Sequence, residues 1–209
     1  MPGTLARIRR LALTSLAAVT VALATAACGG PVRPVTPARP SSSAAAFTGK
    51  WTGLAGPCPT LTGTVATSLG KTGPGKPGPA DADTPVVQNI NCTWGEGEGS
   101  VSVSLYLNRS DGPRPADETT AQEFQRSFDK AVADGSIRHE RPEPGLADQA
   151  YLGIHKDRVT IELWVLSSNA RMTVFHQVPE PNETARESAL AQHRDTVRGL
   201  AADVLDDLR

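Results

Sequence analysis

The sequence predicts an α+β fold in which an antiparallel sheet of about five strands packs with three helices as a sandwich. Several short runs alternate apolar and polar residues, three segments repeat apolar residues with helical spacing, and short turns separate neighbouring strand candidates. Of the 209 residues, 39% are hydrophobic but only 4% are aromatic, and 19 Gly and 17 Pro indicate that part of the chain is linker. One domain is therefore expected.

Helical spacing is found at 61–69, 120–134 and 184–208. The first segment places Leu at its two ends and stops at a glycine, which is typical of a C-terminal helix cap. The second and third segments each begin with a capping box, Thr followed three residues later by Glu, at 120–123 and 184–187. We therefore expect one short and two longer amphipathic helices.

Five strands are predicted from alternation, at 86–94, 101–107, 149–154, 158–166 and 171–178. The first two are joined by a glycine-rich segment and form a hairpin. The segment 71–85 and the charged, proline-rich segment after the second helix are predicted as loops.

One face of this sheet is aliphatic, and the helices are expected to pack there. The opposite face then carries aromatic rings mixed with polar groups, which is the composition of a binding surface. The candidate ligand-binding residues are Tyr106, Glu162, Trp164, Arg171 and Phe175. The alternative is that the last helix or the long loops cover this face, so that the rings are ordinary core.

The N-terminus has the features of an export signal. Three Arg precede an uncharged run from Leu11 to Ala27, and Cys28 follows at once. The segment 23–28 resembles the lipobox of bacterial lipoproteins, which implies cleavage before Cys28 and a diacylglyceryl group, with palmitate-type acyl chains, on its sulfur. Ordinary cleavage after Ala27 is the alternative. We predict a signal peptide at 1–27, a Pro/Ser/Ala-rich stalk at 28–48, and one domain at 49–209 on the extracytoplasmic face of the cell membrane.

Charge limits the partners. The 21 basic and 22 acidic residues give a net charge of −1, so the basic field that sequence-independent nucleic-acid binding needs is missing. We expect no nucleic-acid partner. The expected partners are the membrane, through the lipid anchor, and an unidentified envelope ligand or protein.

The cysteines fit an exported protein. If Cys28 carries the lipid, Cys58 and Cys92 remain as an even pair in an oxidising compartment, and we predict a disulfide between them. No metal site is predicted, because the four His residues lack the usual ligand spacings. His193, on the apolar stripe of the last helix, is interpreted as a residue at the edge of the core.

No motif predicts a cofactor or a catalytic residue. The pattern G-x-G-x-x-G at Gly73, Gly75 and Gly78 is interrupted by prolines and no helix follows it. No G-x-S-x-G occurs. Paired carboxylates of a cell-envelope hydrolase meet only in space, so an enzyme remains one alternative and a passive envelope spacer another. A non-catalytic binding domain is the preferred function.

Three segments also suggest a family: Pro57-Cys58 leading to Leu69-Gly70, Cys92-Thr93-Trp94, and 145–151 with the sequence GLADQAY. Together they resemble a family of actinobacterial lipoproteins of unknown function, similar to the extracellular sensor domains of serine/threonine kinases. Ala147 stands where that family usually has a second glycine. The resemblance implies a disulfide and a sensor-like sandwich, and no catalytic residue.

Overall fold

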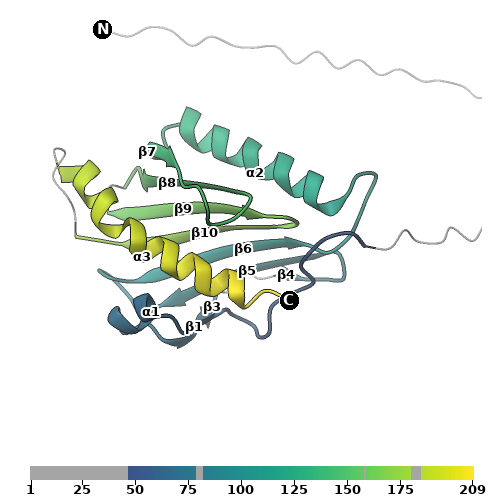
Figure 1. Cartoon of the computed structure of the whole chain (residues 1–209), viewed down its shortest axis with the longest axis horizontal. Helices are drawn as coiled ribbons and strands as arrows, with labels where there is room; N and C mark the ends of the chain where they lie inside the picture. Colours follow the sequence, from purple (N-terminus) through teal and green to yellow (C-terminus); the bar gives the residue numbers. More distant parts are fainter. Residues whose placement is uncertain (1–46, 79–81, 158, 180–184) are drawn as a thin grey trace, which may run out of the picture. The chain divides into compact units, whose positions relative to one another are not determined.

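The computed structural model describes residues 47–78, 82–157, 159–179 and 185–209, which form an α+β domain (Figure 1). The predicted fold class is therefore confirmed in its general form. The predicted signal peptide and most of the predicted stalk lie outside the described residues.

The main sheet is antiparallel throughout and larger than predicted. Seven strands follow the order β3-β5-β6-β10-β9-β8-β7, and β4 also pairs with β5. Their bounds are β3 Lys76–Pro77, β4 Ala82–Asp83, β5 Val87–Trp94, β6 Val101–Asn108, β7 Ile137–Pro142, β8 Gln149–His155, β9 Thr160–Ser167 and β10 Ala170–Gln177. A separate two-stranded sheet pairs β1, Thr60–Leu61, with β2, Gly73–Pro74.

The estimate of about five strands was wrong because the edges of the sheet were missed. β3 and β4 arise from the segment 71–85, predicted as a loop, and β7 arises from the charged segment after the second helix. Edge strands tolerate proline and charge because one side of their backbone needs no partner strand, so they show little alternation.

Three helices are present: α1 Thr64–Ser68, α2 Ala116–Ala133 and α3 Arg186–Asp206. The capping box predicted at Thr120 is wrong, because α2 begins four residues earlier, where Asp111 Oδ1 accepts a hydrogen bond from the Ala116 amide at 2.7 Å. Thr120 is buried inside the helix and donates its hydroxyl to the Ala116 carbonyl at 2.7 Å. Thr184 lies outside the described residues.

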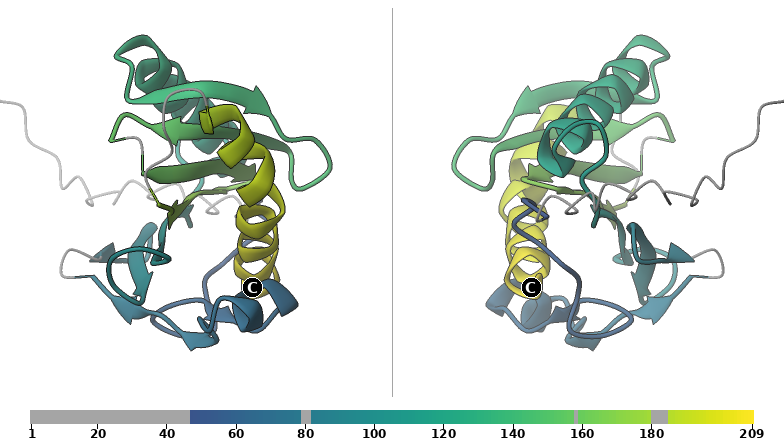
Figure 2. Two further views of the ribbon diagram at one scale, coloured as in Figure 1. Left: turned by 90° about the vertical axis from the view of Figure 1, so that its left-hand side faces the viewer. Right: turned by 90° about the vertical axis from the view of Figure 1, so that its right-hand side faces the viewer.

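The helices cover both faces of the sheet (Figure 2). α1 and α3 lie on the aliphatic face, hereafter the first face, and α2 lies on the opposite, second face. The predicted packing of all helices on one face is therefore wrong. The main core lies between α3 and the first face; its largest fully buried side chains include Leu105, Leu107, Leu152, Ile161, Leu163, Leu190 and Leu200.

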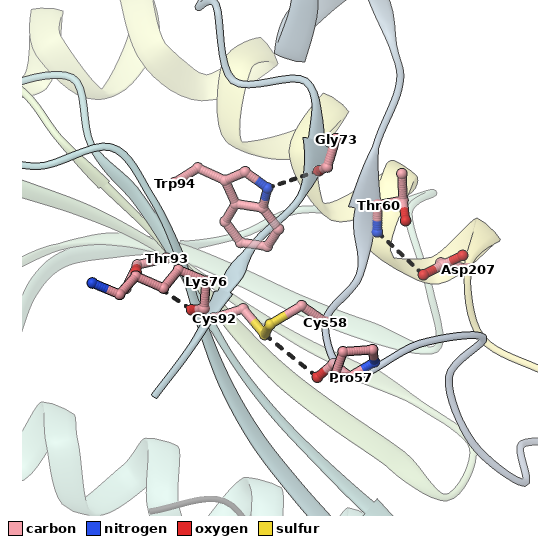
Figure 3. Close-up of a disulfide and its surroundings, with 9 residues drawn as sticks. All are labelled: Pro57, Cys58, Thr60, Gly73, Lys76, Cys92, Thr93, Trp94 and Asp207. Carbon is pink, nitrogen blue, oxygen red and sulfur yellow. Dashed lines mark hydrogen bonds between the residues drawn. A yellow bond between two sulfur atoms is a disulfide. The ribbon is translucent and has the colours of Figure 1, made fainter. Parts of the chain in front are cut away.

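The predicted disulfide is confirmed. Cys58 and Cys92 are bonded, with their Cα atoms 5.9 Å apart, and the bond ties the segment before β1 to β5 (Figure 3). The Trp94 ring lies beside the bridge, and its Nε1–H donates to the Gly73 carbonyl at 2.9 Å. A Cβ at Gly75 would lie 2.7 Å from the Trp94 ring. The missing side chain of Gly75 thus allows the chain to pack against the Trp94 ring, and Gly73 contributes its backbone carbonyl.

Two buried polar side chains join distant segments. Glu143 accepts hydrogen bonds from Arg194 and Arg198 of α3, at 2.8 to 3.0 Å, and so links the end of β7 to that helix. Asn169, in the β9–β10 turn, bonds both backbone groups of Trp51 and also donates to the Asn108 carbonyl at 2.7 Å. These contacts fix α3 and the N-terminal segment of the domain.

Candidate functional site

The second face of the sheet is built by strict alternation along β6, β9 and β10. Tyr106 of β6 pairs with Arg171 of β10, and Phe175 of β10 pairs with Glu162 of β9. Trp164 follows Glu162 on the same side of β9. All five candidate ligand-binding residues therefore lie on one face, as alternation predicts.

Helix α2 covers part of this face. The Phe128 ring stacks on Tyr151 of β8 with centroids 4.2 Å apart and meets Trp164 edge-on at 5.7 Å, and Phe124 contacts the same two rings. Trp164 is consequently half-buried. For Trp164 the alternative of a covered ring is correct in part, although the covering helix is α2 and not α3.

A first cavity of about 360 Å³ lies where α2 meets β6 and β10. Arg171 crosses it: its guanidinium lies 4.7 Å from the Tyr106 ring centroid and donates to Ser127 Oγ of α2 at 3.1 Å. Glu123 Oε2 lies 3.7 Å from Arg171 Nη2. The cavity is lined by Asn89, Ser104, Tyr106, Phe124, Ser127, Trp164, Arg171, Met172 and Thr173. It thus combines ring surface with hydroxyl and amide groups.

A second cavity of about 260 Å³ lies further along the same three strands. It is lined by Ser100, Ser102, His155, Asp157, Thr160, Glu162, Phe175 and Gln177. Three pairs of next neighbours on the same side of a strand have one residue in each cavity. These pairs are Ser102 and Ser104, Glu162 and Trp164, and Phe175 and Thr173. The two cavities therefore adjoin, and together they are called the second-face groove.

Glu162 is the most unusual residue of the groove, because its carboxyl group is only 3% exposed. Its Oε2 accepts a hydrogen bond from Trp164 Nε1 at 2.7 Å, and its Oε1 lies 3.9 Å from His155 Nε2. Burial raises the pKa of Glu162 above its ordinary value, and the negative charge of Asp157 adds to this, whereas Trp164 and His155 act in the opposite direction.

The neighbouring Asp157 is held in the ionised form. Burial alone would raise its pKa, but hydrogen bonds from the Thr160 hydroxyl, the Val159 amide and His155 outweigh burial and lower it. His155 Nδ1 lies 3.1 Å from Asp157 Oδ2. One cavity thus contains two carboxyl groups whose pKa values are shifted in opposite directions.

The sequence-predicted site residues are divided between the two cavities. Tyr106, Trp164 and Arg171 line the first, and Glu162 and Phe175 line the second. His155 and Asp157 were missed as site residues. His155 is the last residue of β8, one position beyond the predicted strand, and Asp157 lies in the turn before β9. Alternation along β8 could have indicated His155, whereas only the proximity of an acid to β9 in the sequence could have indicated Asp157.

The predicted lipid attachment at Cys28 lies outside the described residues. Among the helices of the described ranges, none has both the length and the apolar character needed to cross a bilayer. The same residues contain no cluster of three or more His, Cys, Asp or Glu side chains suited to a metal ion.

No protein family model, characterised protein or solved structure matches this chain. The candidate site therefore rests on its own geometry.

Proposed function

We propose that this protein is a lipid-anchored, extracytoplasmic binding domain that takes a small polar ligand in the second-face groove. The observation that carries the proposal is the groove itself: two adjoining cavities lined by aromatic rings, hydroxyl groups and three charged side chains, on a rigid sheet. Small-molecule sites typically combine an apolar wall with a few polar groups that orient the ligand. A sensor-like use of that ligand belongs to the same proposal.

The proposed extracytoplasmic location of the protein is supported by the sequence and by the disulfide. The basic residues, apolar run and Cys28 have the order of a lipoprotein signal. The Cys58–Cys92 bond is suited to an oxidising compartment, where disulfides persist. Intact-mass analysis of the membrane fraction tests this part: we expect a chain that begins at Cys28 with added lipid mass. A chain without lipid and free in the medium would contradict it.

Ligand binding is tested by screening the isotope-labelled full chain by NMR against glycan fragments, acyl lipids and short peptides. A true ligand should shift resonances of residues lining the groove. Replacing Ser104, which lines the first cavity, by Tyr should fill the groove and abolish those shifts. Ser68→Tyr is the matched control, because Ser68 is exposed on α1, on the other side of the sheet.

Two results would contradict the binding function. One is a screen in which no compound shifts groove resonances at millimolar concentration. The other is a ligand whose binding is unaffected by Ser104→Tyr. Because Trp164 packs under α2, Trp164→Ala would disturb the fold as well as the groove, and Ser104→Tyr is the cleaner variant.

A second candidate, a cell-envelope hydrolase, is favoured by one observation. The pKa values of Glu162 and Asp157 are shifted apart within one cavity, as in acid/base pairs. Glu162 would then act as the general acid and Asp157 as the base. Turnover of an envelope glycan by the wild type, lost in Glu162→Gln, would support the hydrolase over the binding domain.

A further inference from the structure

We propose that the second cavity binds a primary ammonium group, held between Glu162, His155 and the Phe175 ring. This inference rests on the proposed binding function and adds the chemical class of the ligand. It starts from hydrogen-bond acceptors that face the cavity without donors.

The first acceptor is Glu162 Oε1. Oε2 accepts from Trp164, but the contact of Oε1 with His155 Nε2 is 3.9 Å long, which is beyond hydrogen-bond length. A carboxylate that is 3% exposed needs donors, because burying an unpaired charge is costly. A ligand with N–H groups and a positive charge would supply both the hydrogen-bond donors and the opposite charge.

The second acceptor is His155 Nε2. His155 Nδ1 lies 3.1 Å from the Asp157 carboxylate and 3.4 Å from the Asp157 amide N–H. In the neutral ring with its proton on Nδ1, directed at the carboxylate, Nε2 presents a lone pair. Two acceptors, Nε2 and Glu162 Oε1, therefore lie 3.9 Å apart at the same cavity, a spacing that one donor group with several N–H bonds can bridge.

The aromatic wall adds a third contribution. Phe175 lies directly opposite Glu162 on the neighbouring strand and is half-buried, so part of its ring faces the cavity. A cation beside a ring is attracted by the negative face of the π system. The described lining residues include two carboxyl groups, one histidine and neither Lys nor Arg, so acidic groups outnumber basic groups among them.

These features favour a primary ammonium over a quaternary ammonium and over a neutral alcohol. A quaternary ammonium has no N–H to give to Glu162 and His155, and a neutral alcohol has no charge to balance the carboxylates. Lysine side chains, amino sugars and aliphatic diamines all supply this group.

The test uses the indole N–H resonance of Trp164, which donates directly to Glu162. The full chain contains three Trp residues, so the other two indole signals serve as internal controls. The probes are n-butylammonium, Nα-acetyl-lysine amide, glucosamine, tetramethylammonium and n-butanol. We expect the primary amines to shift the Trp164 signal with a Kd of about 1 mM, typical of a fragment, and the last two probes to leave it unchanged.

Two variants locate the site. Glu162→Gln keeps an acceptor for Trp164 but removes the charge, and should weaken amine binding by about tenfold or more. Phe175→Leu should weaken it by roughly threefold through loss of the ring. Glu140→Gln, on exposed β7, is the matched control and should bind like the wild type.

The inference is overturned if the primary amines leave the Trp164 signal unchanged, if they bind equally to Glu162→Gln, or if butanol binds as well as butylammonium. The probe comparison needs only the wild-type chain, so it decides even if a variant misfolds. If amines fail while a neutral ligand from the screen is blocked by Ser104→Tyr, the binding function stands and only the ammonium assignment fails. If nothing binds the groove, both fail.

Discussion

Reduction of the Cys58–Cys92 bond should cost this domain a large part of its stability. The two cysteines are 34 positions apart, and the chain between them contains β1, α1 and the segment that packs against Trp94. In the chain-entropy model, closing a loop of about 35 residues lowers the entropy of the unfolded chain enough to stabilise the folded state by about 4 kcal/mol at 25 °C. Reduction removes this restriction, so the unfolded chain regains its entropy and the stabilisation is lost.

The assay is urea unfolding of the full chain, followed by circular dichroism, in oxidised and reduced form. Reduction changes no side chain except the two sulfurs, so it isolates the cross-link. Cys58→Ala/Cys92→Ala should behave like the reduced chain, with a small additional loss because both side chains are 1% exposed and leave cavities. The slope of the free energy of unfolding against urea concentration should rise slightly, since the unfolded chain without the bond exposes more surface.

A loss below about 1 kcal/mol on reduction would refute this reasoning. It would mean that the unfolded chain keeps the loop closed, or that the 58–92 segment contributes little to the cooperative unit. Cys28→Ser is the control: it removes the remaining cysteine and should leave the free energy of unfolding unchanged.

Three further predictions concern buried polar groups. Glu143→Gln should destabilise the domain by about 2–4 kcal/mol in urea unfolding, because two arginines of α3 lose their charged acceptor; Glu140→Gln should cost almost nothing. Asn169→Ala should cost about 1–3 kcal/mol, by leaving three partly buried backbone groups without this partner. Burial, and the neighbouring His193, lower the pKa of His176, so between that lowered pKa and about 6.5 the unfolded chain binds more protons. Stability should therefore fall as the pH drops through this window, and less so in His176→Phe, as urea unfolding from pH 7.5 to 5 would show.

The pH experiment needs one correction. Because the pKa of Glu162 is raised, the folded state takes up a proton more readily there, and stability is lost as the pH rises through that raised pKa. This effect opposes that of His176. Repeating the pH series with Glu162→Gln, with and without His176→Phe, separates the effect of His176 from that of Glu162.

The centre of the sheet could be predicted from the sequence because each strand has one buried face. Val101, Val103 and Leu105 alternate with half-buried polar residues, and β5, β6, β8, β9 and β10 appear within about two residues of the predicted bounds. β7 could not be found in this way, since three consecutive residues, Arg138 to Glu140, are exposed and the strand contains a bulge.

The sheet face that α2 covers could not be predicted from its apolar stripe, for a different reason. Its apolar stripe shows that one side of the helix is buried, but not against which sheet face. The choice follows from partners distant in sequence: Phe128 of α2 finds the rings of Tyr151 and Trp164 on the second face. Similarly, alternation predicts Glu162 on that face, but the turn after His155 that brings Asp157 beside it has no periodic signal.

The most direct test of the second-face groove as the binding site is an intermolecular NOE experiment on the full chain with bound n-butylammonium and ring-labelled Phe. The chain has four Phe residues, of which one, Phe175, lines the second cavity. We predict NOEs from the methylene protons of the amine to the Phe175 ring, lost in Glu162→Gln. NOEs to Phe47 or Phe128 in place of Phe175, or none from a bound amine, would contradict the account.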